Sequence, residues 1–230
     1  MSAAVVAGVV LVVLPIAFNV AFAELAATFD YPDVLRHPTL EVLERFRAGG
    51  SRLVLLWWGF ALTAVALAPL AVLVSDALVG AAPVVLSLAT TVGVLAALVQ
   101  FLGLVRWPFL VPFLAREVDG PDVDPARREA VDIVFQAFNR YLGVAVGEHL
   151  GYLLTGAWSV LVGVASVQSA AVPVLVGVVG IVVGVLLAVC SLEFVGGFER
   201  EGWRVAAAMT PVVYVAWSLW LAATGVALLL

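Results

Sequence analysis

Hydrophobic residues occupy most of this chain in six runs, separated by short polar connections. At about 1.5 Å per residue in a helix, each run is long enough to cross the roughly 30 Å hydrocarbon layer of a membrane. The predicted spans are residues 3–26, 53–75, 81–107, 141–167, 171–195 and 205–229. The pattern therefore predicts an all-α, polytopic integral membrane protein, in which a bundle of six transmembrane helices forms one domain over residues 1–230.

The arginines indicate which side of the membrane each connection faces. All 11 basic residues are arginines, and they lie after the first span, around the connection between the third and fourth spans, and before the last span. The connections near Asp76 and Gln168 have none, and neither do the two chain ends. Because basic residues mark cytoplasmic connections, we expect both termini outside, in a multi-pass protein of the cell membrane.

The first span has a competing interpretation as a secretory signal. Ala21-Phe22-Ala23 resembles a small-residue cleavage site at the end of an apolar stretch. However, no basic residue precedes that stretch, and cleavage would place the arginine-rich first connection outside. We therefore expect the span to be retained.

Two polar stretches are expected to be helical. Leu40, Leu43 and Phe46 share one face of a segment that Gly49-Gly50 can end, which predicts a short interfacial helix after the first span. Asp124 can cap a second helix that begins at Pro125 and continues into the fourth span.

Small residues recur in the fourth and fifth spans, where they let neighbouring helices approach closely. The fourth span has Gly143, Gly147, Gly151, Thr155, Ser159 and Gly163, and the fifth has Gly177, Gly180, Gly184, Ala188 and Ser191. We interpret both faces as contacts within one chain, with a homo-oligomer interface as the alternative.

The tryptophans fall into two predicted groups. Trp57, Trp58, Trp107 and Trp203 lie near the predicted cytoplasmic span ends, which is typical of an aromatic belt at the membrane surface. Trp158, Trp217 and Trp220 lie deeper and are expected in the core, with an aromatic pocket for an apolar ligand as the alternative.

Composition excludes several classes of function. The chain is 64% hydrophobic and only 12% charged, which excludes an ordinary soluble globule. It has no lysine, so a retinal or pyridoxal Schiff base cannot form, and the single cysteine, Cys190, excludes a cysteine-ligated cluster. No metal-binding motif is present, and a net charge of −5 argues against nucleic acid as a partner. Membrane lipid is the expected partner, with a second copy or another membrane protein as alternatives.

Five ionisable residues lie within the predicted spans: Glu24, Arg106, Glu148, His149 and Glu193. A charge at mid-bilayer costs roughly 2.5–3.5 kcal/mol, so such groups usually pair, face the bundle interior or contact water. In the predicted topology all five fall in the cytoplasmic half, and Tyr152 shares a helix face with Glu148. This convergence predicts a cytoplasm-facing polar pocket.

Three roles are open for these residues. An ion pair between Arg106 and a glutamate can fix the helix register. Alternatively, Glu148 and His149 bind a ligand, an ion or a proton, with Arg106 as the counter-charge. Catalysis by His149 and Glu148 is the third role, but no nucleophile or metal motif supports it.

The leading functional hypothesis is therefore a protein that binds or transports a small ligand, ion or proton. The alternative is a noncatalytic partner subunit or regulator of a membrane complex, whose arginine-rich connections dock other proteins or anionic headgroups. An intramembrane enzyme is the third hypothesis.

Three strings in the chain resemble a known family. They are YPDVLR at 31–36, GLVRWPFLVP at 103–112 and NRYLGVAVGEHLGY at 139–152. They resemble bacterial and archaeal membrane proteins catalogued as domain of unknown function 4386. The resemblance implies six helices, carries no established activity, and makes Arg106, Glu148 and His149 the positions to test.

Overall fold

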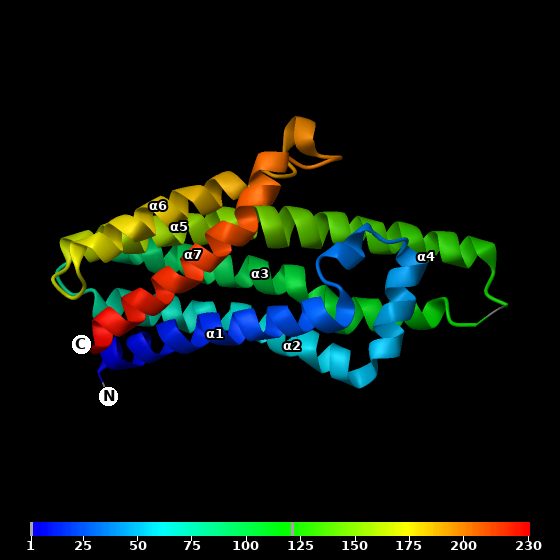
Figure 1. The fold of residues 1–230 in the computed structure, drawn as a ribbon, viewed down its shortest axis with the longest axis horizontal. Coiled ribbons are helices and arrows are strands. Elements are labelled where there is room, and N and C mark those ends of the chain that lie inside the picture. Colours follow the sequence, from blue (N-terminus) through cyan, green and yellow to red (C-terminus); the bar gives the residue numbers. More distant parts are fainter. Residues whose placement is uncertain (1, 121) are drawn as a thin grey trace.

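Six long helical rods, laid side by side, make up the computed structural model, which describes residues 2–120 and 122–230 (Figure 1). In chain order the rods are α1 (Ala3–Phe29), α2 (Thr39–Ala77), α3 (Pro83–Glu117), a continuous rod of three parts, α6 (Val174–Cys190) and α7 (Arg204–Leu229). The three-part rod consists of α4 (Pro125–Phe138), the π-helix η2 (Asn139–Leu150) and α5 (Gly151–Gln168). Two short 3-10 helices, η1 (Asp33–Arg36) and η3 (Gly196–Phe198), lie in connections.

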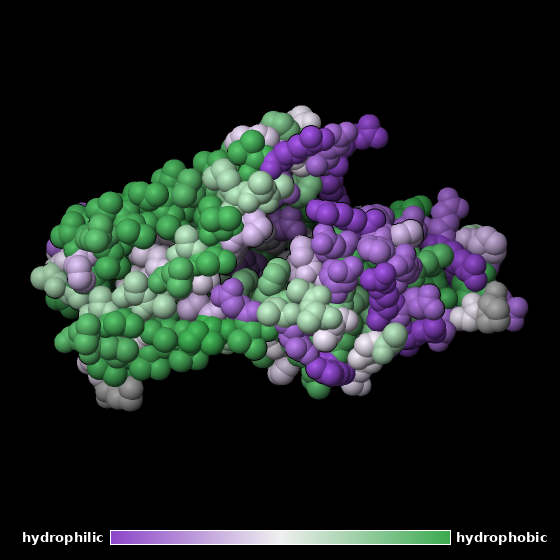
Figure 2. Space-filling view, viewed as in Figure 1, coloured by the Kyte–Doolittle hydropathy of each residue, from purple (hydrophilic) through white to green (hydrophobic). Residues whose placement is uncertain are grey.

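The outer surface of the molecule divides into two parts. The part that carries both termini is hydrophobic over α1, α6 and α7, whereas the opposite end is hydrophilic (Figures 1 and 2). Among the described residues, five helices are long and apolar enough to cross a membrane, and α6 is a shorter apolar helix of 17 residues. The chain is therefore an all-α, multi-pass membrane protein, as the hydrophobic runs predict. The continuous rod Pro125–Gln168 also confirms that the helix beginning at Pro125 runs into the fourth span.

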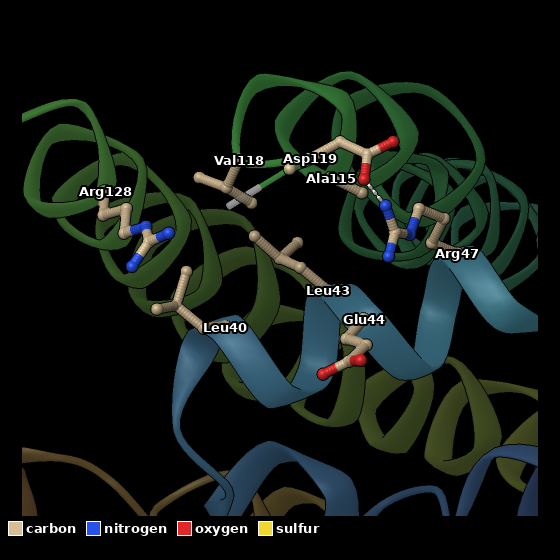
Figure 3. Close-up of a pocket in the computed structure, with 9 residues that line it drawn as sticks. Leu40, Leu43, Glu44, Arg47, Ala115, Val118, Asp119 and Arg128 are labelled. Carbon is tan, nitrogen blue, oxygen red and sulfur yellow. Dashed lines mark ion pairs between the residues drawn. The ribbon is translucent and has the colours of Figure 1, made fainter. Parts of the chain in front are cut away.

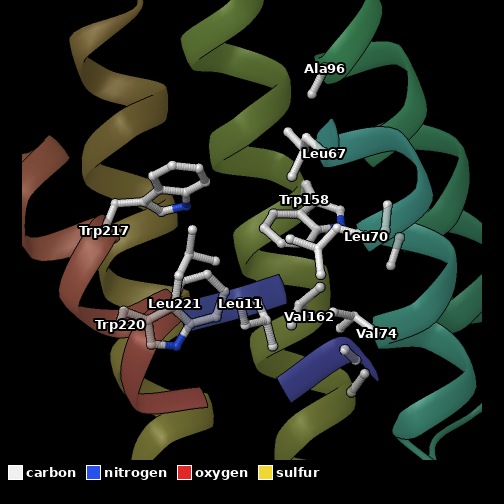
Figure 4. Close-up of a cluster of buried hydrophobic side chains, with 14 of the residues drawn as sticks. Leu11, Leu67, Leu70, Val74, Ala96, Trp158, Val162, Trp217, Trp220 and Leu221 are labelled. Atoms are coloured by element: carbon white, nitrogen blue, oxygen red, sulfur yellow. The ribbon is translucent and has the colours of Figure 1, made fainter. Parts of the chain in front are cut away.

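The buried side chains form two hydrophobic clusters, one toward each end of the bundle. The apolar-end cluster surrounds Trp158, with Trp217 and Trp220 beside it, so these three tryptophans lie in the core as expected (Figure 4). The polar-end cluster surrounds Trp57 and Trp107. The second cluster therefore extends the packed interior beyond the apolar part of the molecule.

The structure corrects the assignment of Trp57 and Trp107 to an aromatic belt. Their side chains are only 0% and 1% exposed, and their rings stack with centroids 4.5 Å apart. They are covered because the first segment of α2 folds over this end and buries Leu43 and Phe46 against the same cluster. Gly50, with a φ of 55°, provides the kink that joins this segment to the rest of α2. Trp58, in contrast, is 46% exposed.

The apolar face of that first segment thus packs on the protein itself. Val42, Leu43 and Phe46 are buried, and only Leu40 remains exposed, at 43%. The interfacial helix expected from the sequence is present as a helix, and its buried face contacts the polar-end cluster rather than lipid.

Glycines allow close helix packing, against another backbone at Gly147 and Gly184 and against a side chain at Gly143, Gly151 and Gly180. Gly143, Gly147 and Gly151 lie against Arg106, Gly103 and Gln100 of α3; Gly180 lies against Trp220 of α7, and Gly184 against Gly156 of α5. Each of these five glycines therefore meets another helix of the same chain. The polar end is held partly by ion pairs, since Arg45 contacts both Glu41 and Asp30.

The contact between α5 and α6 leaves no room for a side chain at Gly184. A Cβ atom there would lie 2.5 Å from the carbonyl oxygen of Gly156. We expect Gly184→Ala to lower the free energy of unfolding by about 1–3 kcal/mol, because overpacking forces the two backbones apart. Melting in detergent measures the loss. Gly59→Ala is the matched control, since a Cβ at Gly59 meets nothing within 4 Å; equal melting of the two variants would contradict the close contact.

Glu41 provides a pH-dependent contribution at the polar end. Although desolvation acts in the opposite direction, hydrogen bonds with Arg45 Nη2 (2.7 Å) and His37 Nδ1 (2.9 Å) lower the pKa of Glu41 below its usual 4.5. A lowered folded-state pKa stabilises the fold above the unfolded-state value and loses that contribution as the pH falls through the folded-state value. We expect Glu41→Gln to melt below the wild type at pH 7, with the difference closing under acidic conditions. Glu44→Gln, at an exposed position without an ion pair to any described residue, is the control.

Candidate functional site

A layer of polar side chains separates the two hydrophobic clusters. Along α3, Ala97 belongs to the apolar-end cluster and Trp107 to the polar-end cluster, so Arg106 lies at the boundary. Along the three-part rod, Phe135 and Trp158 belong to opposite clusters, and the segment 139–152 crosses between them. We call this layer the polar centre; it contains Arg106, Asn139, Glu148, Tyr31, Tyr152 and Tyr214.

Arg106 is buried in the polar centre, with 8% of the residue exposed. Its guanidinium donates hydrogen bonds to the carbonyl oxygen of Gly103 and, over 3.0 Å, to Oδ1 of Asn139. The guanidinium carbon also lies 5.4 Å from the centre of the Trp107 ring, a favourable cation–π distance. No carboxylate of a described residue lies within 4.0 Å of the group. Neutral acceptors and an aromatic face therefore accommodate Arg106, in place of the ion pair with a glutamate that was one of the three open roles.

The helix that faces Arg106 has an unusual backbone. The 12 residues Asn139–Leu150 form a π-helix, a form that usually occurs as a single turn and often at functional sites. Gly143 permits the contact, because a Cβ atom there would lie 2.7 Å from Nη2 of Arg106. The π-helix changes which residues share a face, and nothing in the glycine and hydrophobic pattern indicates it. The sequence therefore located the segment but not its geometry.

Glu148 lies on this π-helix and has no partner of its own. It is half-buried, and no hydrogen bond or ion pair joins its carboxylate to any described residue. Arg106 and Glu193 are the charged groups close enough to act on it. A carboxylate inside a helical bundle normally pairs or contacts water. The hydrogen-bonding capacity of the Glu148 carboxylate is therefore not used by any described residue.

Three tyrosines from different elements lie within range of the Glu148 charge, and two of them, Tyr152 and Tyr214, pack ring against ring with centroids 5.2 Å apart. Tyr31 follows α1, Tyr152 lies on α5 and Tyr214 on α7; each is half-buried and within range of the Glu148 charge. Their hydroxyl groups form no hydrogen bond with a described residue. For Tyr31, which lies outside the spans, desolvation and then the Glu148 charge raise the pKa to about 12, while Arg106 acts in the opposite direction. Its hydroxyl is therefore protonated at neutral pH.

Sequence reasoning identified Tyr152 but missed Tyr31 and Tyr214. Tyr31 lies in a connection rather than a span, and Tyr214 lies 62 residues beyond Tyr152, so no helical spacing links either to Glu148. The presence of a phenol in the apolar last span was the one available signal for Tyr214.

Figure 2 shows a hollow between the hydrophobic part and the hydrophilic end, with hydrophilic residues on its floor.

The other expected site residues lie apart from Glu148 or point elsewhere. Nδ1 of His149 lies 2.8 Å from the carbonyl oxygen of Ser191, so this ring contacts the end of α6. Glu193 is half-buried in the connection after α6, close enough for its charge to act on Glu148. Glu24 forms an ion pair with Arg52 on the surface and is not part of the polar centre.

A separate surface cavity of about 400 Å³ lies at the hydrophilic end. It is formed by the first segment of α2, the end of α3 and the start of α4 (Figure 3). Arg47 and Asp119 on its wall form an ion pair, and Arg128 and Glu44 face it from either side. None of the candidate ligand-binding or proton-binding residues predicted from the sequence lines this cavity.

The comparisons identify the family of the chain. Residues 6–225 match the family described as "Domain of unknown function (DUF4386)". The chain belongs to the DUF4386 family. The match covers nearly all of the sequence and confirms the resemblance carried by the three strings. Comparison with curated proteins and with solved structures gives no match.

Within the DUF4386 chain, the chemistry of the polar centre is that of carboxylate, phenol and guanidinium groups. No group of three or more histidine, cysteine, aspartate or glutamate residues able to hold a metal ion occurs in the part of the chain that the structure describes. The unpartnered groups around Glu148 can accept hydrogen bonds, and the tyrosine hydroxyls can also donate them. This arrangement can bind a polar ligand or exchange a proton.

The buried guanidinium makes Asn139 important for stability. We expect Asn139→Ala to lower the free energy of unfolding by about 1–3 kcal/mol, because it removes an acceptor from a buried charged group. Asn139→Asp retains an acceptor at the same position and is expected to melt well above the alanine variant. The comparison is made by thermal unfolding in detergent. If the two variants melt together, residue 139 is not the acceptor that Arg106 requires.

Proposed function

We propose that this DUF4386 protein binds a small ligand, an ion or a proton at Glu148, in a polar pocket inside the bundle, and that binding serves transport or sensing. Tyr31, Tyr152 and Tyr214 complete the pocket, and Glu193 lies on its hydrophilic side. The observation that carries the proposal is the half-buried Glu148 carboxylate, which has no partner although Arg106 is close.

The roles of the nearby residues follow from their contacts. Arg106 provides the counter-charge to Glu148 at a distance, because its own hydrogen bonds go to Gly103 and Asn139. His149 positions the π-helix against α6 through the carbonyl oxygen of Ser191. Neither residue therefore has to contact the ligand directly.

We propose further that the pocket opens to the cytoplasm and that both termini lie outside the cell. The arginine-bearing connections support this orientation, because basic residues are retained on the cytoplasmic side. The location of both termini at the hydrophobic end is consistent with it (Figure 1).

A docking role for the arginine-rich connections receives less support. Arg36, Arg45, Arg47, Arg52, Arg127 and Arg140 are each paired with a carboxylate of this chain. Paired side chains leave little net positive charge for anionic headgroups. We therefore favour the pocket over the regulator as the basis of function.

The proposal is tested by screening the purified protein in detergent against small cations, anions and neutral polar solutes, at matched ionic strength, for a rise in melting temperature. We expect a shift with one class in the wild type and its loss in Glu148→Gln. Glu129→Gln, at an exposed position on α4, is the matched control and should keep the shift. A shift that survives in Glu148→Gln, or the absence of any shift, overturns the proposal.

A further inference from the structure

We propose that the polar centre recognises the primary ammonium group of a small organic cation. This inference rests on the proposed function, because it names the ligand class for the same pocket. Glu148 of the polar centre and Glu193 in the connection beside it carry two negative charges against the single positive charge of Arg106, a net charge of −1 when both carboxyls are ionised.

The positive charge of Arg106 is not available to an anion. One guanidinium nitrogen donates to Gly103 and another to Asn139, and the Trp107 ring lies beside the group. Gly143 closes off Nη2, since even a Cβ atom there would lie 2.7 Å away. The half-buried carboxylate of Glu148, by contrast, has no donor facing it. The group exposed to the pocket is therefore the anion, and its ligand is a cation.

The tyrosines distinguish a primary ammonium from a quaternary one. A quaternary ammonium has no N–H and binds against open aromatic faces. Here Tyr214 stacks on Phe18 with an interplanar angle of 12°, and Tyr31 is packed at right angles against Trp57 with centroids 4.9 Å apart. These rings are already engaged with other rings, whereas their hydroxyl oxygens are free.

The free acceptors match the donors of a primary ammonium. That group has three N–H donors and no acceptor, as in a lysine side chain. The carboxylate of Glu148 and the hydroxyl oxygens of Tyr31, Tyr152 and Tyr214 provide four accepting groups, and the Tyr152 and Tyr214 rings pack against each other with centroids 5.2 Å apart. A charge-assisted bond to Glu148 supplies most of the attraction. The apolar tail of the cation can lie toward Phe18, which stacks on Tyr214 and packs partly buried at the polar-end cluster.

The test uses four probes that share a butyl tail: n-butylammonium, butyltrimethylammonium, butyrate and n-butanol. Binding to the wild-type protein in detergent is measured by calorimetry and by the rise in melting temperature, at neutral pH and fixed ionic strength. We expect n-butylammonium to bind tightest. Glu148→Gln should weaken its binding at least about tenfold, the loss of one charge-assisted contact.

Tyrosine variants separate the hydroxyl contacts from packing. Tyr214→Phe and Tyr152→Phe keep the rings and should each weaken n-butylammonium binding by about two- to tenfold. Tyr141→Phe is the matched control, because Tyr141 is 67% exposed and lies outside the polar centre; its binding should equal that of the wild type. Because these substitutions retain ring volume, the folded state survives them, and melting without ligand verifies this.

The outcomes distinguish this inference from the proposed function. Tighter binding of butyltrimethylammonium, or equal binding in Tyr214→Phe, Tyr152→Phe and wild type, overturns recognition of a primary ammonium. Binding of butyrate or n-butanol that requires Glu148 overturns the cation class while the pocket itself stands. If no probe binds and the broader screen also gives no shift that depends on Glu148, both the inference and the proposed function fail.

Discussion

The burial of one guanidinium group constrains the centre of this protein. A charged group removed from water costs several kcal/mol unless it finds hydrogen-bond acceptors. Arg106 finds them in the carbonyl oxygen of its own helix, at Gly103, and in Asn139 on the helix opposite. For Asn139 to reach it, the π-helix η2 must lie directly against α3. The absence of side chains at Gly103, Gly143 and Gly147 makes that approach sterically possible.

The same contact explains why Glu148 is free. Because neutral acceptors and the Trp107 face already accommodate Arg106, the neighbouring carboxylate is not used to neutralise it. The Glu148 charge instead acts on three tyrosines from separate elements of the chain. A carboxylate held open in a helical bundle destabilises the fold, and a bound cation or proton would offset that cost. The structural role of Arg106 and the proposed binding role of Glu148 are thus two consequences of one arrangement.

Particular residues show how far sequence reasoning reaches. The long hydrophobic runs predict the membrane helices, and the scarce charges indicate Arg106 and Glu148, because an ionisable residue in an apolar run is conspicuous. Trp57 and Trp107 were misassigned, since a tryptophan near a span end looks the same in sequence whether it faces lipid or is covered by another segment. Depth along the membrane predicts Glu24 near the site. In the structure its side chain is partly exposed on the surface of the bundle and pairs with Arg52. Depth along a helix can be read from the sequence, whereas direction around it depends on the neighbours.

The sequence by itself determined an all-α membrane protein, the approximate positions of its helices and the narrow set of ionisable residues within them. These features depend on local composition, because the hydrophobic length of each segment decides whether it spans a membrane. Only the tertiary structure decided that Arg106 binds Asn139, that a π-helix carries Glu148, and that Tyr214 packs against Tyr152. These contacts connect residues far apart in the chain, so they arise from the packing of six helices and not from the pattern of any one of them.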